Sequence, residues 1–99
     1  MFNILVAEDD SDIRELFCTV LSDSGYNAIP AADGAEALEI IDREYIDLIV
    51  ADIMMPNVDG CELTRFLRDA KYDLPILMVT AKDQFADMQR GFRMGSMII

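Results

Sequence analysis

Apolar and polar positions along the chain divide it into two kinds of segment. Short runs that are apolar almost throughout alternate with longer segments in which apolar residues recur every three or four positions. The short runs predict strands and the longer segments predict helices, because these periods match the two geometries. The predicted strands are Asn3–Ala7, Asn27–Pro30, Leu48–Asp52 and Ile76–Thr80. The predicted helices are Ser11–Ser24, Gly34–Glu44, Gly60–Ala70 and Gln84–Met94.

The alternation of strands and helices predicts an α/β fold with a doubly wound parallel sheet. Strands that are apolar throughout are typical of a parallel sheet covered on both faces, and the connections between them should be right-handed. Pro30 lacks the N–H that a central strand needs, so we expect its strand at the periphery. The length of 99 residues suits a single domain over residues 1–99.

Three predicted helices carry, near their start, an Asp followed three positions later by a Glu. This spacing resembles a capping box and places negative charge at the helix start, where the helix dipole favours it. We therefore assign these six acids a structural role and do not count them as ligands. They are Asp12 and Glu15, Asp33 and Glu36, and Asp59 and Glu62.

Other polar residues follow directly on apolar strands. Glu8 and Asp9 come after the first predicted strand, Asp52 ends the third, and Thr80 ends the fourth. The carboxyl ends of parallel strands meet at one edge of the sheet, where open α/β sheets bind ligands. Carboxylate oxygens suit Mg²⁺, a carboxylate can act as a nucleophile, and a hydroxyl can bind phosphoryl oxygens. The pattern predicts a cation and phosphoryl site.

Three motifs then carry a resemblance to a known family. They are Ile4-Leu5-Val6-Ala7-Glu8-Asp9-Asp10, Asp52-Ile53-Met54-Met55-Pro56 continuing to Asp59-Gly60, and Pro75-Ile76-Leu77-Met78-Val79-Thr80-Ala81. In this order and spacing the chain resembles the receiver domain of two-component response regulators. The resemblance implies a flavodoxin-like doubly wound parallel sheet with strand order 2-1-3-4. It also implies a role in signal transduction and transcription regulation.

The resemblance implies a Mg²⁺ site. Asp9 and Asp52 would bind the ion directly, Met54 would offer its backbone carbonyl, and Glu8 would act through a water molecule. No other metal or cofactor is implied.

The resemblance also implies how the phosphoryl group is received. Asp52 would be the phosphoacceptor, Thr80 the switch hydroxyl that moves toward the phosphoryl group, and Ala81 the small residue that leaves the group room to enter. The donor in this family is a phosphohistidine on a sensor histidine kinase, and a chain without histidine fits the recipient. Such a domain is a switch and not a turnover enzyme.

The chain departs from the family pattern at its end. Family receivers have a fifth strand ending in a lysine that contacts the phosphoryl group, and then a fifth helix. Neither lysine of this chain, Lys71 or Lys82, matches that position. We therefore expect a C-terminally incomplete receiver whose fifth strand and helix are missing or displaced. An open edge on the fourth strand and uncovered apolar surface on the first helix would favour a homodimer or an exchanged-element dimer.

Composition limits the partners. The net charge of −11 argues against direct binding of nucleic acid or an acidic membrane surface. No long apolar span or signal peptide is found, and Cys18 and Cys61 lack metal spacing, so we expect a cytoplasmic protein. The absence of histidine excludes imidazole-based catalysis and histidine metal ligation.

Two other functions remain open at this point. One is a Mg²⁺-dependent aspartate-nucleophile phosphatase, although the run Glu8, Asp9, Asp10 places a glutamate where the first nucleophile would be. The other is a receiver-like interaction module that no longer switches, because the family lysine is missing.

Overall fold

The computed structural model describes residues 1–52, 58–79 and 97–98. Its elements, in chain order, are β1 (Asn3–Ala7), α1 (Ser11–Asp23), β2 (Asn27–Ala31), α2 (Gly34–Arg43), β3 (Leu48–Asp52), α3 (Gly60–Asp69), β4 (Ile76–Val79) and β5 (Met97–Ile98). The first seven confirm the predicted elements to within one residue at each described end. The predicted helix Gln84–Met94 lies outside the described residues.

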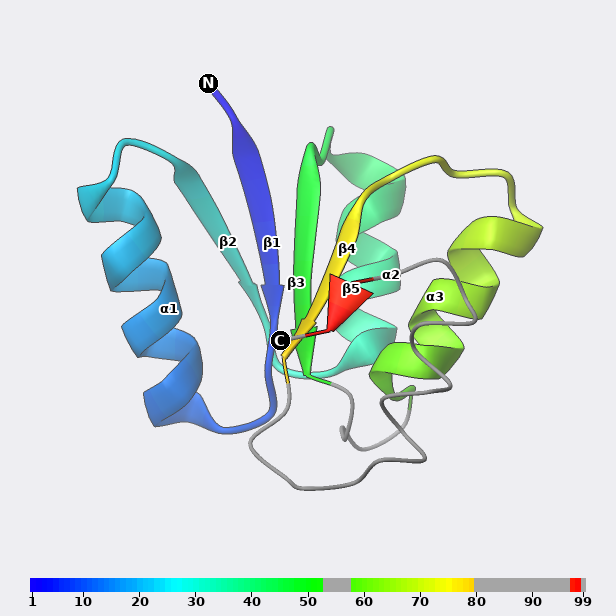
Figure 1. The fold of residues 1–99 in the computed structure, drawn as a ribbon, viewed down its shortest axis with the longest axis horizontal. Coiled ribbons are helices and arrows are strands. Elements are labelled where there is room, and N and C mark those ends of the chain that lie inside the picture. The colour runs from blue at the N-terminus through cyan, green and yellow to red at the C-terminus, as the bar shows by residue number, and fades with distance from the viewer. Residues whose placement is uncertain (53–57, 80–96, 99) are drawn as a thin grey trace.

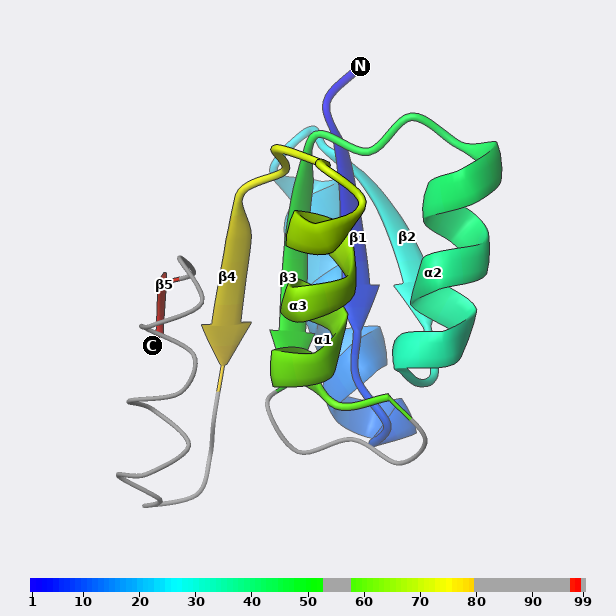
Figure 2. The ribbon, with the colours of Figure 1, turned by 90° about the vertical axis from the view of Figure 1, so that its right-hand side faces the viewer.

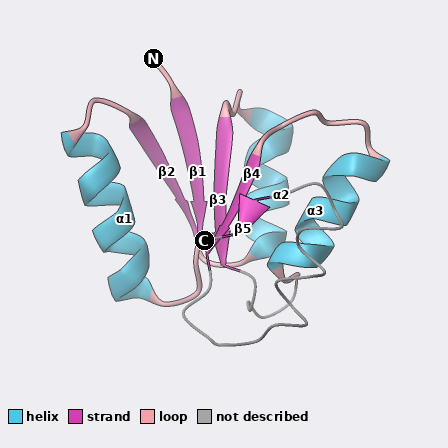
Figure 3. Ribbon diagram, viewed as in Figure 1, coloured by secondary structure: helices cyan, strands magenta, loops and turns pink. Residues whose placement is uncertain are grey.

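The strands form one parallel sheet in the order β2-β1-β3-β4-β5 (Figures 1 and 3). The order 2-1-3-4 predicted for the first four strands is confirmed. The chain runs outward from β1 to β2 and then crosses back over β1 to reach β3. Because right-handed crossovers in opposite directions lie on opposite faces, α1 covers one face while α2 and α3 cover the other (Figures 1 and 2).

Strand β5 corrects one expectation about the sheet edge. Met97 and Ile98 pair in parallel with Leu77 and Met78 of β4. The edge of β4 that we expected to stay open is therefore covered at these two positions. We expected the fifth strand to be missing or displaced because neither lysine of the chain matches the family lysine that ends it.

Apolar residues form a core layer on each face of the sheet. Alternate residues of a strand point to opposite faces, so Leu5 and Ala7 join one layer while Ile4 and Val6 join the other. The layer under α2 and α3 is the larger, and its other members include Ile40, Ile49, Leu63, Leu67 and Met78. The layer under α1 consists of Ile4, Val6 and Val50, and the partly buried residues packed against it are Phe17, Cys18, Leu21, Leu48, Leu77 and Val79.

Helix α1 is poorly covered. None of its residues is fully buried, and the exposed fractions of Ile13, Leu16 and Val20 are 38%, 61% and 53%. These three residues are spaced at three and four positions, so they form one apolar stripe. This confirms the uncovered apolar surface that we predicted for the first helix.

Aspartates cap all three helices in the described part of the chain. The Oδ1 atoms of Asp33 and Asp59 accept hydrogen bonds from the backbone N–H of Glu36 and Glu62, each at 2.8 Å. The structural role predicted for these two aspartates is confirmed. For α1 the cap is Asp10 and not Asp12, because Asp10 Oδ1 accepts from the backbone N–H of Asp12 at 2.9 Å and the helix begins at Ser11.

Candidate functional site

The register of the sheet brings two of the predicted site residues together. Ala7 at the end of β1 lies opposite Ala51 of β3. Glu8 follows Ala7 and Asp52 follows Ala51, so the same register places Glu8 opposite Asp52. Parallel neighbours in register lie side by side on one edge of a sheet. Glu8 and Asp52, which are 44 positions apart in the sequence, are therefore adjacent at the carboxyl edge.

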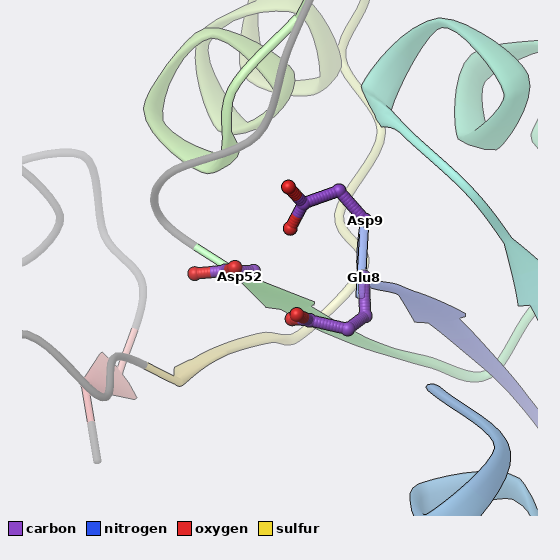
Figure 4. A group of neighbouring side chains, drawn as sticks. All are labelled: Glu8, Asp9 and Asp52. Atoms are coloured by element: carbon purple, nitrogen blue, oxygen red, sulfur yellow. The ribbon is translucent and has the colours of Figure 1, made fainter. Parts of the chain in front are cut away.

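Three carboxylates converge at this edge (Figure 4). One oxygen from each of Glu8, Asp9 and Asp52 lies within 4.8 Å of the others. Glu8 is buried, Asp52 is half-buried and Asp9 is exposed. An all-oxygen set of carboxylates, open to water on one side, is the donor chemistry that Mg²⁺ prefers. The residues present therefore fit this ion.

Burial and the neighbouring carboxylates change the protonation of Glu8. Burial raises the pKa of Glu8 from its ordinary value of 4.5 to about 7. The charge of Asp52, a hydrogen bond shared with Asp52 and the charge of Asp9 act in the same direction, and the N–H of Asp10, 3.3 Å from Glu8 Oε1, opposes them. The cluster thus favours either a proton or a cation near neutral pH.

Backbone contacts hold Glu8 in place. Its N–H donates to the carbonyl of Ala31 at 3.0 Å, and its carbonyl accepts from Nη1 of Arg14 at 2.7 Å. Arg14 lies in the first turn of α1 and ties that helix to the end of β1. The sequence analysis did not single out Arg14. The feature of the sequence that could have indicated this contact is an arginine in the first turn of the helix that follows an acidic strand end.

The structure places only part of the predicted site. It brings Glu8, Asp9 and Asp52 together, as the spacing predicted. Met54, Thr80 and Ala81 lie outside the described residues, as does Lys82. Val79, the residue before Thr80, lies opposite Asp52 in the register of β3 and β4.

No helix in the part of the chain that the structure describes is long and apolar enough to cross a membrane.

Comparison with protein families and curated proteins gives consistent matches. The family model described as the response regulator receiver domain matches residues 4–98. The chain is 45% identical over 93 residues to the alkaline phosphatase synthesis transcriptional regulatory protein PhoP of Bacillus subtilis, covering 94% of this chain and 39% of that protein. It is 43% identical over 93 residues to the response regulator MprA of Mycobacterium leprae, covering 94% and 41%. The chain spans about two fifths of the length of these relatives.

Solved structures share the fold. The receiver domain of the Francisella response regulator 1452 has a TM-score of 0.92 and 33% identity, covering 100% of this chain and 83% of that one. The response regulator TrrA of Thermotoga maritima, solved in complex with Mg²⁺ and BeF, has a TM-score of 0.88 and 31% identity, covering 100% and 86%.

Proposed function

The chain belongs to the response regulator receiver domain family, and we propose that Asp52 is the residue on which it accepts a phosphoryl group. Response regulators take such groups from sensor histidine kinases, and their receiver domains are signalling domains. The observation that carries the proposal is the convergence of three carboxylate oxygens within 4.8 Å around the end of β3. Asp52 is the member of this cluster on the central strand, where open α/β sheets bind ligands.

We propose that the same cluster binds Mg²⁺. Asp9 and Asp52 would bind the ion directly, with the Met54 carbonyl, and Glu8 would act through a water molecule. When bound, the ion supplies positive charge that offsets the negative charge on the transferring phosphoryl oxygens. The raised pKa of Glu8 supports this assignment, because burial and the charges of Asp52 and Asp9 raise it, and a cation would offset the negative charge that they disfavour.

Phosphoryl transfer then uses the Asp52 carboxylate as nucleophile. A carboxylate oxygen attacks the phosphorus of a phosphohistidine, and an O–P bond forms as the P–N bond breaks. The imidazole nitrogen keeps the electron pair of the broken bond and takes up a proton. We propose that Thr80 then moves toward the new phosphoryl group and that Ala81 leaves it room to enter.

The proposal extends to the setting of this domain. Residues 1–99 would form one receiver domain of a cytoplasmic response regulator, loaded by a sensor histidine kinase and acting in transcription. The exposed stripe of Ile13, Leu16 and Val20 supports an apolar partner for α1, which a second copy of the chain would supply as a homodimer or exchanged-element dimer.

Intact mass tests the acceptor. The protein is incubated with acetyl phosphate in the presence and absence of Mg²⁺, beside Asp52→Asn and the control Asp42→Asn. Asp42 is an exposed acid on α2, so its substitution removes the same charge away from the cluster. We expect a gain of one phosphoryl group that needs Mg²⁺, persists in the control and vanishes in Asp52→Asn. No gain in the folded wild-type protein would reject the proposal.

Release of inorganic phosphate distinguishes a receiver from an aspartate-nucleophile phosphatase, which the comparisons do not favour. A receiver is modified once and loses the group slowly. Repeated hydrolysis of a small phosphomonoester, in large excess over protein, would instead indicate the phosphatase.

A further inference from the structure

Arg14, in the first turn of α1, makes two hydrogen bonds to the segment that carries the acidic site residues. Its side-chain Nη1 donates to the Glu8 carbonyl at 2.7 Å, and its backbone N–H donates to the Asp10 carbonyl at 2.9 Å. These two carbonyls lie on either side of Asp9 in the chain. A single residue of α1 therefore holds the segment around Asp9 at both of its ends.

The bond from the Arg14 side chain acts on the peptide unit that joins Glu8 to Asp9. Because a peptide unit is planar, a hydrogen bond to its oxygen restrains the orientation of the whole unit. The preceding unit is held by the Glu8 N–H, which donates to the Ala31 carbonyl at 3.0 Å. Arg14 extends this hold by one unit, to the peptide whose two residues both contribute carboxylates to the cluster.

The helix itself does not explain an arginine at this position. The dipole of a helix disfavours positive charge in the first turn and favours acids there, such as Asp12. The guanidinium gains instead a charge-assisted hydrogen bond to the Glu8 carbonyl, which is stronger than a bond between neutral groups. Arg14 is half-buried, so salt and water screen this interaction only in part. The contact with Glu8 thus accounts for the residue better than its place in the helix does.

We propose that Arg14 is a positioning residue for the Mg²⁺ site, because it holds the Glu8–Asp9 peptide so that both carboxylates stay beside Asp52. The inference rests on the proposed function of the cluster. Arg14 acts on the ion through Glu8 and Asp9. Through its charge alone, Arg14 would repel a cation, so losing that charge would strengthen Mg²⁺ binding. Losing the positioning bond weakens Mg²⁺ binding, and the two effects therefore have opposite signs.

The test compares Arg14→Met with Arg14→Lys. Methionine keeps an unbranched stem but has no donor, and lysine keeps a cationic donor. Titration calorimetry gives the Kd for Mg²⁺, intact mass gives the rate of loading from acetyl phosphate, and urea denaturation gives stability. We expect Arg14→Met to bind Mg²⁺ about tenfold more weakly, the range seen when groups that support metal ligands are changed, and to load more slowly. Arg14→Lys should bind Mg²⁺ more tightly than Arg14→Met.

Two control variants separate positioning from charge and from helix stability. Arg43→Met removes the same charge from an exposed position in the last turn of α2. Leu21→Ala loosens α1, because Leu21 packs against the core layer under that helix, but it leaves the Arg14 side chain in place. Leu21→Ala should lose stability, and both controls should keep the wild-type Kd.

Unchanged or tighter Mg²⁺ binding in Arg14→Met would overturn the inference and leave the proposed function standing. Equal weakening in Leu21→Ala, or in Arg14→Lys, would overturn it too, since neither result would depend on the donated hydrogen bond. If the wild-type protein itself neither binds Mg²⁺ nor gains a phosphoryl group, the proposed function fails and this inference fails with it.

If Arg14→Met does not fold, nuclear magnetic resonance of the wild-type protein decides. Addition of Mg²⁺ should shift the side-chain Nε–H signal of Arg14 together with the amide signal of Asp9, because the ion pulls on the peptide that Arg14 holds. A shift confined to Asp9 would overturn the inference.

Discussion

The two edges of the sheet carry polar residues in different surroundings. At the carboxyl edge, Glu8, Asp9 and Asp52 bring their carboxylates close together. At the amino edge, Asn3 and Asp47 also border apolar strands, and their polar groups hydrogen-bond to backbone groups of neighbouring segments. The Asn3 N–H donates to Asp47 Oδ2 at 2.7 Å, and the Asn3 side-chain amide donates to the Tyr45 carbonyl at 2.7 Å.

This difference separates polar residues that build the fold from those available for binding. Pairing at the amino edge satisfies each group and ties the starts of neighbouring strands together. Burial at the carboxyl edge, with the neighbouring charges of Asp52 and Asp9, raises the pKa of Glu8 to about 7 and leaves a cluster that a cation would stabilise. Substitutions at the carboxyl edge should therefore change ligand binding most, and substitutions at the amino edge should change stability alone.

Asp9→Asn should have the largest effect. It removes one proposed Mg²⁺ ligand, so we expect the Kd for Mg²⁺ to rise by about ten- to a hundredfold, as for other changes at metal sites. Titration calorimetry measures it. Asp10→Asn is the matched control, because it removes the same charge one position away and asparagine caps helices as well as aspartate does. If both variants bound Mg²⁺ equally weakly, the total negative charge near the site, and not ligation by Asp9, would control Mg²⁺ binding.

The stability of the Mg²⁺-free protein should fall as pH rises from about 4.5 to about 7. The pKa of Glu8 is raised to about 7 in the folded state, so the folded chain holds a proton over a range in which the unfolded chain has released it. The free energy of unfolding therefore has a negative slope in this range, and screening by water limits the fall to about 1–2 kcal/mol.

Urea denaturation at about pH 5 and about pH 8, with a chelator present, measures this fall. Glu8→Gln should show a smaller fall, because glutamine does not titrate, and added Mg²⁺ should also reduce it. A fall of the same size in Glu8→Gln would contradict the assignment to this carboxyl.

Asn3→Ala should destabilise the fold by about 1 kcal/mol and leave Mg²⁺ binding unchanged. It removes the side-chain bond to the Tyr45 carbonyl and the bond that Asn3 Oδ1 accepts from Asn27 at 3.0 Å. Asn27→Ala removes only the second bond and should cost less. Denaturation and calorimetry check both effects, and a weaker Mg²⁺ affinity in Asn3→Ala would show that the two edges are coupled.

Lys71→Gly should give the smallest change, a gain in stability of about 0.5–1 kcal/mol. Helices α1 and α3 end in the same Schellman motif, in which the N–H of Tyr26 bonds to the Leu21 carbonyl and the N–H of Tyr72 bonds to the Leu67 carbonyl. The residue before each tyrosine has a positive φ, 95° at Gly25 and 63° at Lys71.

Only glycine adopts this conformation without strain, so Lys71 stores strain that Gly25 avoids. Gly25→Ala should accordingly lose about as much stability as Lys71→Gly gains, and thermal unfolding measures both. A loss of stability in Lys71→Gly would show that the lysine side chain contributes a contact that outweighs the strain.

The sequence by itself determined the seven elements through β4 and the acidic residues that follow the first and third strands. Periodicity is a local property, and the apolar strands with their flanking acids are visible without coordinates. The resemblance of the three motifs to receiver domains gave the strand order 2-1-3-4. At the start of α1 the sequence indicated two candidates, Asp10 beside Ser11 as a turn or cap residue and Asp12 with Glu15 as a capping box. The structure shows that Asp10 is the cap.

Only the tertiary structure decided which groups meet. The register of β1 against β3 placed Glu8 beside Asp52, and burial at that position raised the pKa of Glu8. The residues at the end of a strand do not by themselves reveal its neighbour in the sheet or how deeply its side chains are buried. Three further contacts join residues that are distant in sequence or separated by a turn. Met97 and Ile98 pair with β4, the Arg14 side chain donates a hydrogen bond to the Glu8 carbonyl, and Gly34 lies against Val58. Such contacts depend on packing in three dimensions, and no periodic pattern in the chain records them.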